Sequence, residues 1–212
     1  GRARRGPVWP SAPADPPTFS IASDPRRTPD TPSLSGLSVA LGVAAAEAVA
    51  PLVSGIGLKW PNDLMRHGRK CAGMLAETRL SGDRERIVFG WGVNLALPDE
   101  LARAIDQPAC GLFDAGAPRL GHEELAGRMA RALIEITRQF LRTGLSGIPE
   151  RWARFDVLAG REITLLEDGR PKLKGIADRF AAGGELRGLT PEGTICVPVS
   201  GLSTRPGALP AK

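Results

Sequence analysis

A cluster of arginines opens the 212-residue sequence. In Gly-Arg-Ala-Arg-Arg-Gly, at residues 1–6, Arg2, Arg4 and Arg5 lie between flexible glycines. The planar guanidinium group pairs with carboxylate or phosphate oxygens through two hydrogen bonds at once. The segment therefore suits a small anionic ligand, although taken alone a disordered basic tail is the simpler interpretation.

A second candidate is the pentapeptide Lys59-Trp60-Pro61-Asn62-Asp63, where a strand-like run meets a turn. A lysine fixed at the end of a strand can be aimed into a cleft, and its charge can stabilise a developing oxyanion or a phosphate. For any single residue, a core tryptophan followed by an ordinary turn explains the pattern equally well. The complete pentapeptide favours a site.

Glycines inside two further strand-like runs point to close approach by a ligand. Gly73 lies in the run 69–77, and Gly90 and Gly92 lie in Gly-Trp-Gly-Val-Asn at 90–94. A glycine in a strand leaves room for a ligand or another backbone against the sheet, but it also marks β-bulges. These glycines support a site only together with the charged segments.

The periodicity of the chain predicts the elements that would position these residues. Apolar residues recur at three- and four-residue spacing from Leu34 to Leu52 and again from about His122 to Arg142, which predicts two core-facing helices. Strand-like runs at 56–60, 71–78 and 86–95 suggest an antiparallel meander, and 19–22 suggests an edge strand. Short alternating segments over 161–199 predict a small β-barrel or sandwich.

Composition excludes several classes of protein. The chain is 42% hydrophobic and 24% charged, and no apolar run is long enough to cross a bilayer. The net charge of +5 is concentrated in a few arginines, so a nucleic-acid-binding stripe is not indicated. Three cysteines without CxxC spacing predict neither a disulfide framework nor a zinc site. Without a signal peptide, a cytoplasmic location is expected.

The order and spacing of the four segments resemble the biotin protein ligases. That family carries an arginine-rich Gly-Arg-Gly-Arg-Arg-Gly loop, then Lys-Trp-Pro-Asn-Asp, then Lys-Leu-Ala-Gly-Ile-Leu with a following Glu, then Gly-x-Gly-x-Asn. The counterparts in this chain are residues 1–11, 59–63, 70–77 and 90–94. The resemblance covers nearly the whole sequence, including the pair Arg151-Trp152 and the terminal barrel.

The resemblance implies both a fold and an activity. The expected fold is α+β, with a mixed or antiparallel sheet and packed helices in a catalytic domain at 1–155, followed by a small C-terminal β-barrel at 156–212. The implied activity uses ATP and Mg²⁺ to convert biotin to biotinyl-5'-AMP and then transfers biotin to a lysine of a carboxylase carrier protein. Dimerisation stays open.

The resemblance also implies roles for individual residues. Arg4 and Lys59 would be catalytic, and biotin would be contacted by Arg2, Ala3, Arg4 and Lys59. The nucleotide would be contacted by Arg5, Trp9, Asn62, Asp63, Gly92, Asn94 and Arg205. The metal ligands stay unassigned.

Departures from the family pattern keep other functions open. Ala3 replaces a loop glycine, and Pro7 stands where the family has arginine. The family's Ser-Thr-Asn segment would precede Gly1, so a shortened chain with weak or no activity is expected. One alternative is a non-catalytic homologue that binds an adenylate or a partner. Another is a lipoate-ligase-like enzyme, against which residues 59–63 argue.

Overall fold

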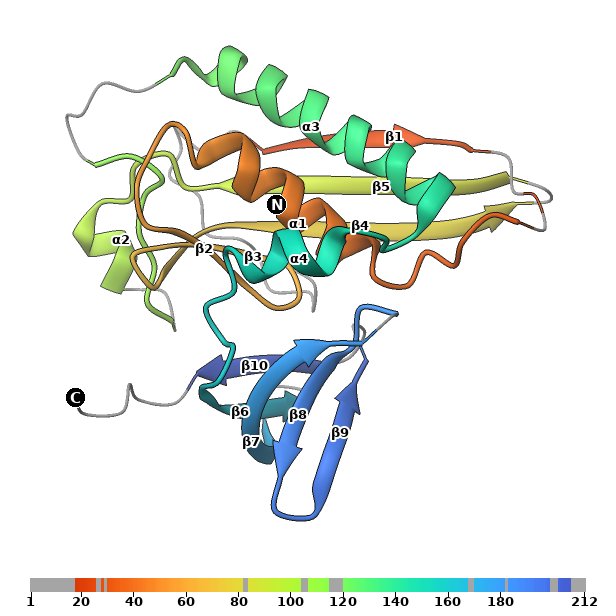
Figure 1. Cartoon of the computed structure of the whole chain (residues 1–212). Helices are drawn as coiled ribbons and strands as arrows, with labels where there is room; N and C mark the ends of the chain where they lie inside the picture. The colour runs from red at the N-terminus through yellow and green to blue at the C-terminus, as the bar shows by residue number, and fades with distance from the viewer. Residues whose placement is uncertain are drawn as a thin grey trace.

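A computed structural model of the chain contains two antiparallel sheets, each of five strands, with helices packed on the first (Figure 1). The predicted α+β class is thereby confirmed. The structure describes residues 18–25, 28, 30–81, 84–103, 107–114, 120–167, 170–181, 183–198 and 202–206.

The first sheet has the strand order β1-β5-β4-β3-β2. Its strands are β1 (Thr18–Ser23), β2 (Ile56–Lys59), β3 (Asp63–Arg66), β4 (Arg69–Ser81) and β5 (Arg84–Val93). Side chains alternate between its two faces, so paired Met74 and Trp91 are buried in the core. The pair beside them, Gly73 and Gly92, belongs to the opposite face.

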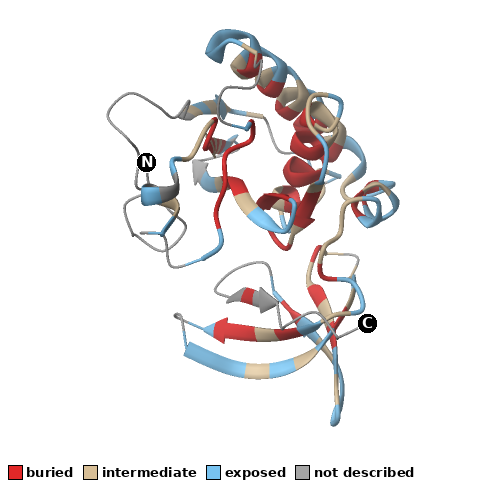
Figure 2. Ribbon diagram, turned by 90° about the vertical axis from the view of Figure 1, so that its left-hand side faces the viewer, coloured by how far each residue is buried: buried red, intermediate tan, exposed pale blue. Residues whose placement is uncertain are grey.

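Helices cover the core face of the first sheet. They are α1 (Leu37–Val49), α3 (His122–Thr143) and α4 (Ile148–Ala153), and a short α2 (Asp99–Arg103) follows β5. Helix α1 is buried over almost its whole length (Figure 2), because it contacts α3 and α4 as well as β2, β3 and β4. Helix α3 buries one stripe, as its spacing predicts, with Leu125, Met129, Leu133, Ile136, Thr137 and Phe140.

The second sheet follows the order β10-β6-β7-β8-β9. Its strands are β6 (Glu162–Glu167), β7 (Arg170–Phe180), β8 (Leu186–Thr190), β9 (Gly193–Val197) and β10 (Leu202–Pro206). The predicted hairpins are present, but closure into a barrel is not observed in the described residues. There β9 pairs only with β8 and β10 only with β6, so the sheet has two edges.

Two elements of the first sheet region differ from the sequence prediction. Residues 63–66, next to the predicted turn, form β3, which the sequence did not predict. Asp63 and Arg66 are charged but buried, so the segment lacks the alternation of polar and apolar residues that indicates a strand. The first helix begins at Leu37 rather than Leu34, after Gly36 with a φ of +82°. No helix in the described part of the chain is long and apolar enough to span a membrane.

Candidate functional site

Two lysines and one aspartate meet where β2, β3 and β4 lie side by side. The Nζ atom of Lys59 is 2.8 Å from Oδ2 of Asp63, and Nζ of Lys70 is 2.6 Å from Oδ1 of the same carboxylate. Strand pairing places Lys59 directly opposite Asp63. The three residues form what we call the lysine–aspartate cluster.

Electrostatics keep the carboxylate of this cluster ionised. Burial pushes the pKa of Asp63 upward, but the charges of Lys70 and Lys59 outweigh burial, so that its pKa lies below the ordinary carboxyl value. Two ammonium groups then share one carboxylate. The three side chains are only 12–14% exposed, so both ammonium groups are held at fixed positions by this carboxylate. Such a site attracts an anion.

The turn between Lys59 and Asp63 is fastened to β4. The side-chain amide of Asn62 donates a hydrogen bond to the carbonyl of Met74, and the N–H of Met74 donates to the carbonyl of Asn62 at 3.1 Å. Trp60 is 1% exposed and anchors the turn in the core. Asn62 therefore has a structural partner, and its nucleotide contact stays a prediction.

A strip of glycines lies beside the cluster. Gly73 pairs with Asp63 on one side and with Gly92 on the other, and Gly92 also pairs with Thr18 of β1. A methyl group added to Gly73 would come within 3.4 Å of Cε and 3.5 Å of Nζ of Lys70. Because Gly73 has no side chain, the side chain of Lys70 can lie close to the β4 backbone, beside Asp63. That this strand binds a ligand stays a prediction.

Asn94, just beyond β5, is buried and bonded within the chain. Its N–H donates to the carbonyl of Cys71 at 2.8 Å, and its carbonyl accepts from the N–H of Leu112 at 2.6 Å. Its side-chain amide donates to the carbonyl of Cys110 at 3.5 Å. In the structure Asn94 holds the end of the glycine-bearing strand.

Five of the predicted site residues thus fall within one region of the first sheet: Lys59, Asn62, Asp63, Gly92 and Asn94. Arg205 lies in β10, where its backbone pairs with Thr164, and its side chain is outside the described residues. The predicted contacts at Arg2, Ala3, Arg4, Arg5 and Trp9 also lie outside the described residues. Their roles stay predictions.

Lys70 is the functional candidate that was missing from the predicted site. Its signal was present, because the quoted segment 70–77 begins with this lysine. The pairing of β3 with β4 folds Lys70 back onto Asp63 across a register shift between Leu64 and Met65. The sequence alone did not show that two lysines share one carboxylate.

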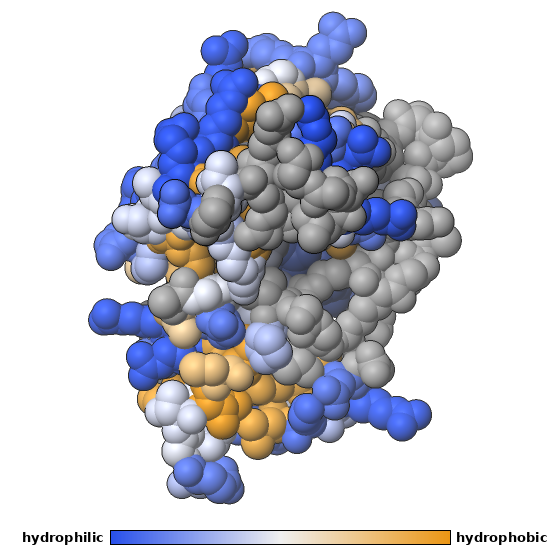
Figure 3. All heavy atoms as spheres, turned by 90° about the vertical axis from the view of Figure 1, so that its right-hand side faces the viewer, coloured by the Kyte–Doolittle hydropathy of each residue, from blue (hydrophilic) through white to orange (hydrophobic). Residues whose placement is uncertain are grey.

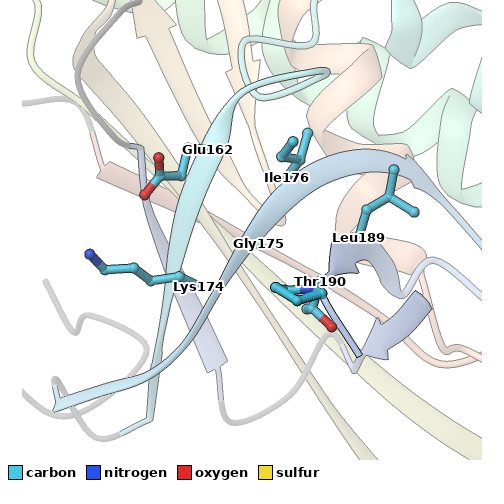
Figure 4. Close-up of a pocket in the computed structure, with 7 residues that line it drawn as sticks. Glu162, Lys174, Gly175, Ile176, Leu189 and Thr190 are labelled. Carbon is cyan, nitrogen blue, oxygen red and sulfur yellow. The ribbon is translucent and has the colours of Figure 1, made fainter. Parts of the chain in front are cut away.

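A shallow hollow on the second sheet offers different chemistry (Figure 4). Its volume is about 380 Å³, and it is lined by Glu162, Lys174, Gly175, Ile176, Leu189, Thr190 and Pro191. Ile176 and Leu189 are 47% and 44% exposed, and apolar atoms gather over this sheet on the surface (Figure 3). The lining comes from the second sheet alone, so the lysine–aspartate cluster is the better candidate for binding a small anion.

Comparisons with known proteins agree with the architecture. A model of the Biotin/lipoate A/B protein ligase family matches residues 1–94. The "Biotin--[acetyl-CoA-carboxylase] ligase" of Mycobacterium tuberculosis is 30% identical over 208 residues, which cover 95% of this chain and 70% of that protein. The "Bifunctional ligase/repressor BirA" of Escherichia coli K12 is 31% identical over 169 residues, 79% of this chain.

Solved structures share the fold. The biotin protein ligase of Aquifex aeolicus, determined in complex with biotin and ATP, superposes with a TM-score of 0.74 at 23% identity, covering 98% of this chain and 85% of that one. The chain spans 49% of the E. coli protein and 41% of its Salmonella typhimurium counterpart. On its similarity to the mycobacterial ligase over most of both sequences, the chain belongs to the biotin protein ligase family.

Proposed function

We propose that this protein activates biotin with ATP and transfers it to a lysine of a biotin carrier protein. The observation that carries the proposal is the lysine–aspartate cluster beside the paired glycines Gly73 and Gly92. Membership in the family supports it, as does the related Aquifex protein whose structure contains biotin and ATP.

The first step brings two anions together. A carboxylate oxygen of biotin attacks the α-phosphorus of ATP, the new P–O bond forms as the bond to the β-phosphate oxygen breaks, and pyrophosphate leaves. Cations at fixed positions reduce the repulsion between the anions and stabilise charge that develops in the transition state. Lys59 and Lys70 supply that charge, and Asp63 fixes both ammonium groups.

The second step uses the mixed anhydride. A neutral lysine amine of the carrier attacks the biotinyl carbonyl, an amide forms, AMP leaves and the amine loses a proton. Water must be kept from the anhydride while the carrier binds. We assign that task to the arginine-rich loop at residues 1–6, with Arg2, Ala3 and Arg4 against biotin.

The remaining nucleotide contacts follow from the family pattern. We place Arg5, Trp9, Gly92 and Arg205 on the nucleotide side, and give Asn62, Asp63 and Asn94 the task of shaping that side through the internal bonds described above. The two-domain division is also proposed, with catalysis in 1–155 and the second sheet in 156–212.

The described residues do not form a magnesium site of their own. Asp63 has both carboxylate oxygens in ion pairs with lysines, and no three His, Cys, Asp or Glu side chains gather in the described ranges. In nucleotide sites Mg²⁺ is held largely by substrate phosphates, where it offsets their charge. We therefore place Mg²⁺ on ATP and derive the protein's part from its lysines.

A transfer assay tests the proposed reaction. The protein is incubated with biotin, ATP, MgCl₂ and a purified biotin carrier domain, and labelled carrier is detected with streptavidin alongside released AMP. The matched control is the carrier whose acceptor lysine is replaced by arginine. We expect AMP release and label on the lysine-containing carrier alone; neither AMP nor label in any condition would contradict the proposal.

A non-catalytic binding protein is the second candidate, favoured by Ala3 and Pro7 in the arginine-rich loop. Isothermal titration separates the two functions. Binding of biotin and ATP without AMP formation supports the binding protein, whereas AMP formation that depends on biotin supports the ligase.

A further inference from the structure

Trp60, the buried residue that follows Lys59, is hydrogen-bonded to the second sheet. The indole Nε1–H of Trp60 donates a hydrogen bond to the carbonyl of Gly184 at 2.9 Å. The hydroxyl of Thr204, in β10, donates to the carbonyl of Trp60 at 3.2 Å. Both bonds are buried, and they fasten the side chain and the backbone of one residue to two different parts of the second sheet.

The residue on the other side of Lys59 is also held. Leu58 donates its N–H to the carbonyl of Phe155 at 2.7 Å and accepts from the N–H of Val157 at 3.0 Å, forming a parallel bridge with Asp156. The segment 155–157 leads directly into the second sheet. Lys59 therefore lies between two residues whose backbones are both bonded to the C-terminal part of the chain.

The turn that receives the indole is itself fixed. Gly184 has a φ of +90° and a methyl group added to it would come within 2.6 Å of Cα of Gly36, at the start of α1. The hydroxyl of Ser35 donates to the carbonyl of Gly183 at 2.9 Å. The Gly183–Gly184 turn is thus packed against α1 with no room for a side chain, so it provides a firm anchor.

We propose that the second sheet positions Lys59 and Asp63 for the reaction, with Thr204 and the Gly183–Gly184 turn as the positioning elements. The inference rests on the proposed ligase function. Because electrostatic stabilisation of a transition state depends on where the charge is placed, a small displacement of the 59–63 turn lowers the rate more than it weakens substrate binding. Thr204 and Gly184 touch no substrate in this proposal.

Thr204→Val is the sharpest perturbation. Valine keeps the branched shape of threonine and removes the hydroxyl that donates to Trp60. Thr204→Ser keeps the donor and should restore function. The matched control is Thr190→Val in β8, whose hydroxyl bonds to the carbonyl of Gly193 within its own hairpin.

Hydrogen–deuterium exchange measures the coupling without requiring turnover. We expect amides of residues 58–66 to exchange at least threefold faster in Thr204→Val, and to be unchanged in Thr204→Ser and Thr190→Val. Unchanged exchange in Thr204→Val would overturn the proposal. If that variant does not fold, Ser35→Ala, an exposed change on the same anchor, takes its place and should speed exchange in the same residues; no change there would equally overturn it.

Kinetics decide whether the coupling serves catalysis. In biotin-dependent pyrophosphate exchange we expect kcat of Thr204→Val to fall about tenfold with KM for biotin within about twofold, and Thr204→Ser to recover to within about twofold of the original. A raised KM with unchanged kcat, or an equal loss in Thr190→Val, would contradict a positioning role. A protein inactive in every form would instead refute the proposed function, and exchange of residues 58–66 would still decide the structural coupling.

Discussion

Removing the charge of Asp63 should destabilise the protein while leaving its shape intact. Asp63→Asn keeps the size of the side chain and one acceptor oxygen, but removes the negative charge that Lys59 and Lys70 share. At 2.6–2.8 Å and an effective dielectric constant of about 20, each pair attracts by about 6 kcal/mol, most of which desolvation offsets.

The net cost follows from what remains after the substitution. Removing one partner of a buried pair costs about 3–5 kcal/mol, because the other charge stays buried. The lysine side chains retain 12–14% exposure and can turn toward water, so we expect the lower end, about 3 kcal/mol of unfolding free energy at pH 7. A control, Glu167→Gln, removes the exposed pair with Lys172 and should cost less than about 1 kcal/mol.

The pH dependence gives this prediction its sharpest form. Because the folded pKa of Asp63 is depressed, the stability contributed by its carboxylate is complete above the unfolded value near 3.8 and is lost as the pH falls through the folded value. Urea unfolding followed by tryptophan fluorescence should therefore show a constant difference in unfolding free energy between the original protein and Asp63→Asn from pH 7 to about 4.5. This difference should shrink only below about pH 4. A difference that already shrinks above pH 5 would mean that burial outweighs the two lysines, and would refute the electrostatic account.

Three further predictions concern the sheets and the core. Gly73→Ala should change the unfolding free energy by less than about 1 kcal/mol, since the added methyl group makes ordinary contacts 3.4–3.8 Å from Lys70 and Asp63. The same substitution should lower the affinity for biotin measured by calorimetry, and undiminished affinity would exclude this strand from the site. Burial raises the pKa of Asp156, so the stability that its protonated carboxyl contributes is present below the unfolded pKa and is lost as the pH rises through the folded pKa. Urea titrations should therefore show the original protein losing stability relative to Asp156→Asn above about pH 4. Equal pH dependence of the two proteins would contradict this. Leu133→Ala in α3, where the side chain is 1% exposed, should cost about 2–5 kcal/mol by the same method, and a loss below about 1 kcal/mol would show that α3 packs loosely.

Sequence periodicity predicted the elements whose burial is one-sided. The spacing of Leu125, Met129 and Leu133 predicts α3, and structure confirms it. Strand β3 was not predicted, because Asp63 and Arg66 are buried charged residues whose partners, among the described residues, come from other strands and from Asp114. Local sequence does not report such partners.

Parts of the candidate site follow the same rule. Lys59 and Asp63 were identified from a contiguous motif, and strand pairing brings them together as neighbours across a hairpin. Lys70 joins them only through the register shift in β3 and β4, and Thr204 reaches Trp60 across 144 residues of sequence. Contacts of this kind depend on tertiary packing and have no signature in residue spacing.

In the proposed reaction, the lysines of the lysine–aspartate cluster promote attack of the biotin carboxylate on ATP. Biotin-dependent exchange of radiolabelled pyrophosphate into ATP tests it most directly, with Lys59→Met compared with Lys172→Met, a change at an exposed lysine of the second sheet. We predict that Lys59→Met lowers the exchange rate by about 10²-fold or more, as expected for loss of a preorganised charge, while Lys172→Met stays within about twofold. Equal rates in the two variants, with exchange intact in both, would contradict the claim.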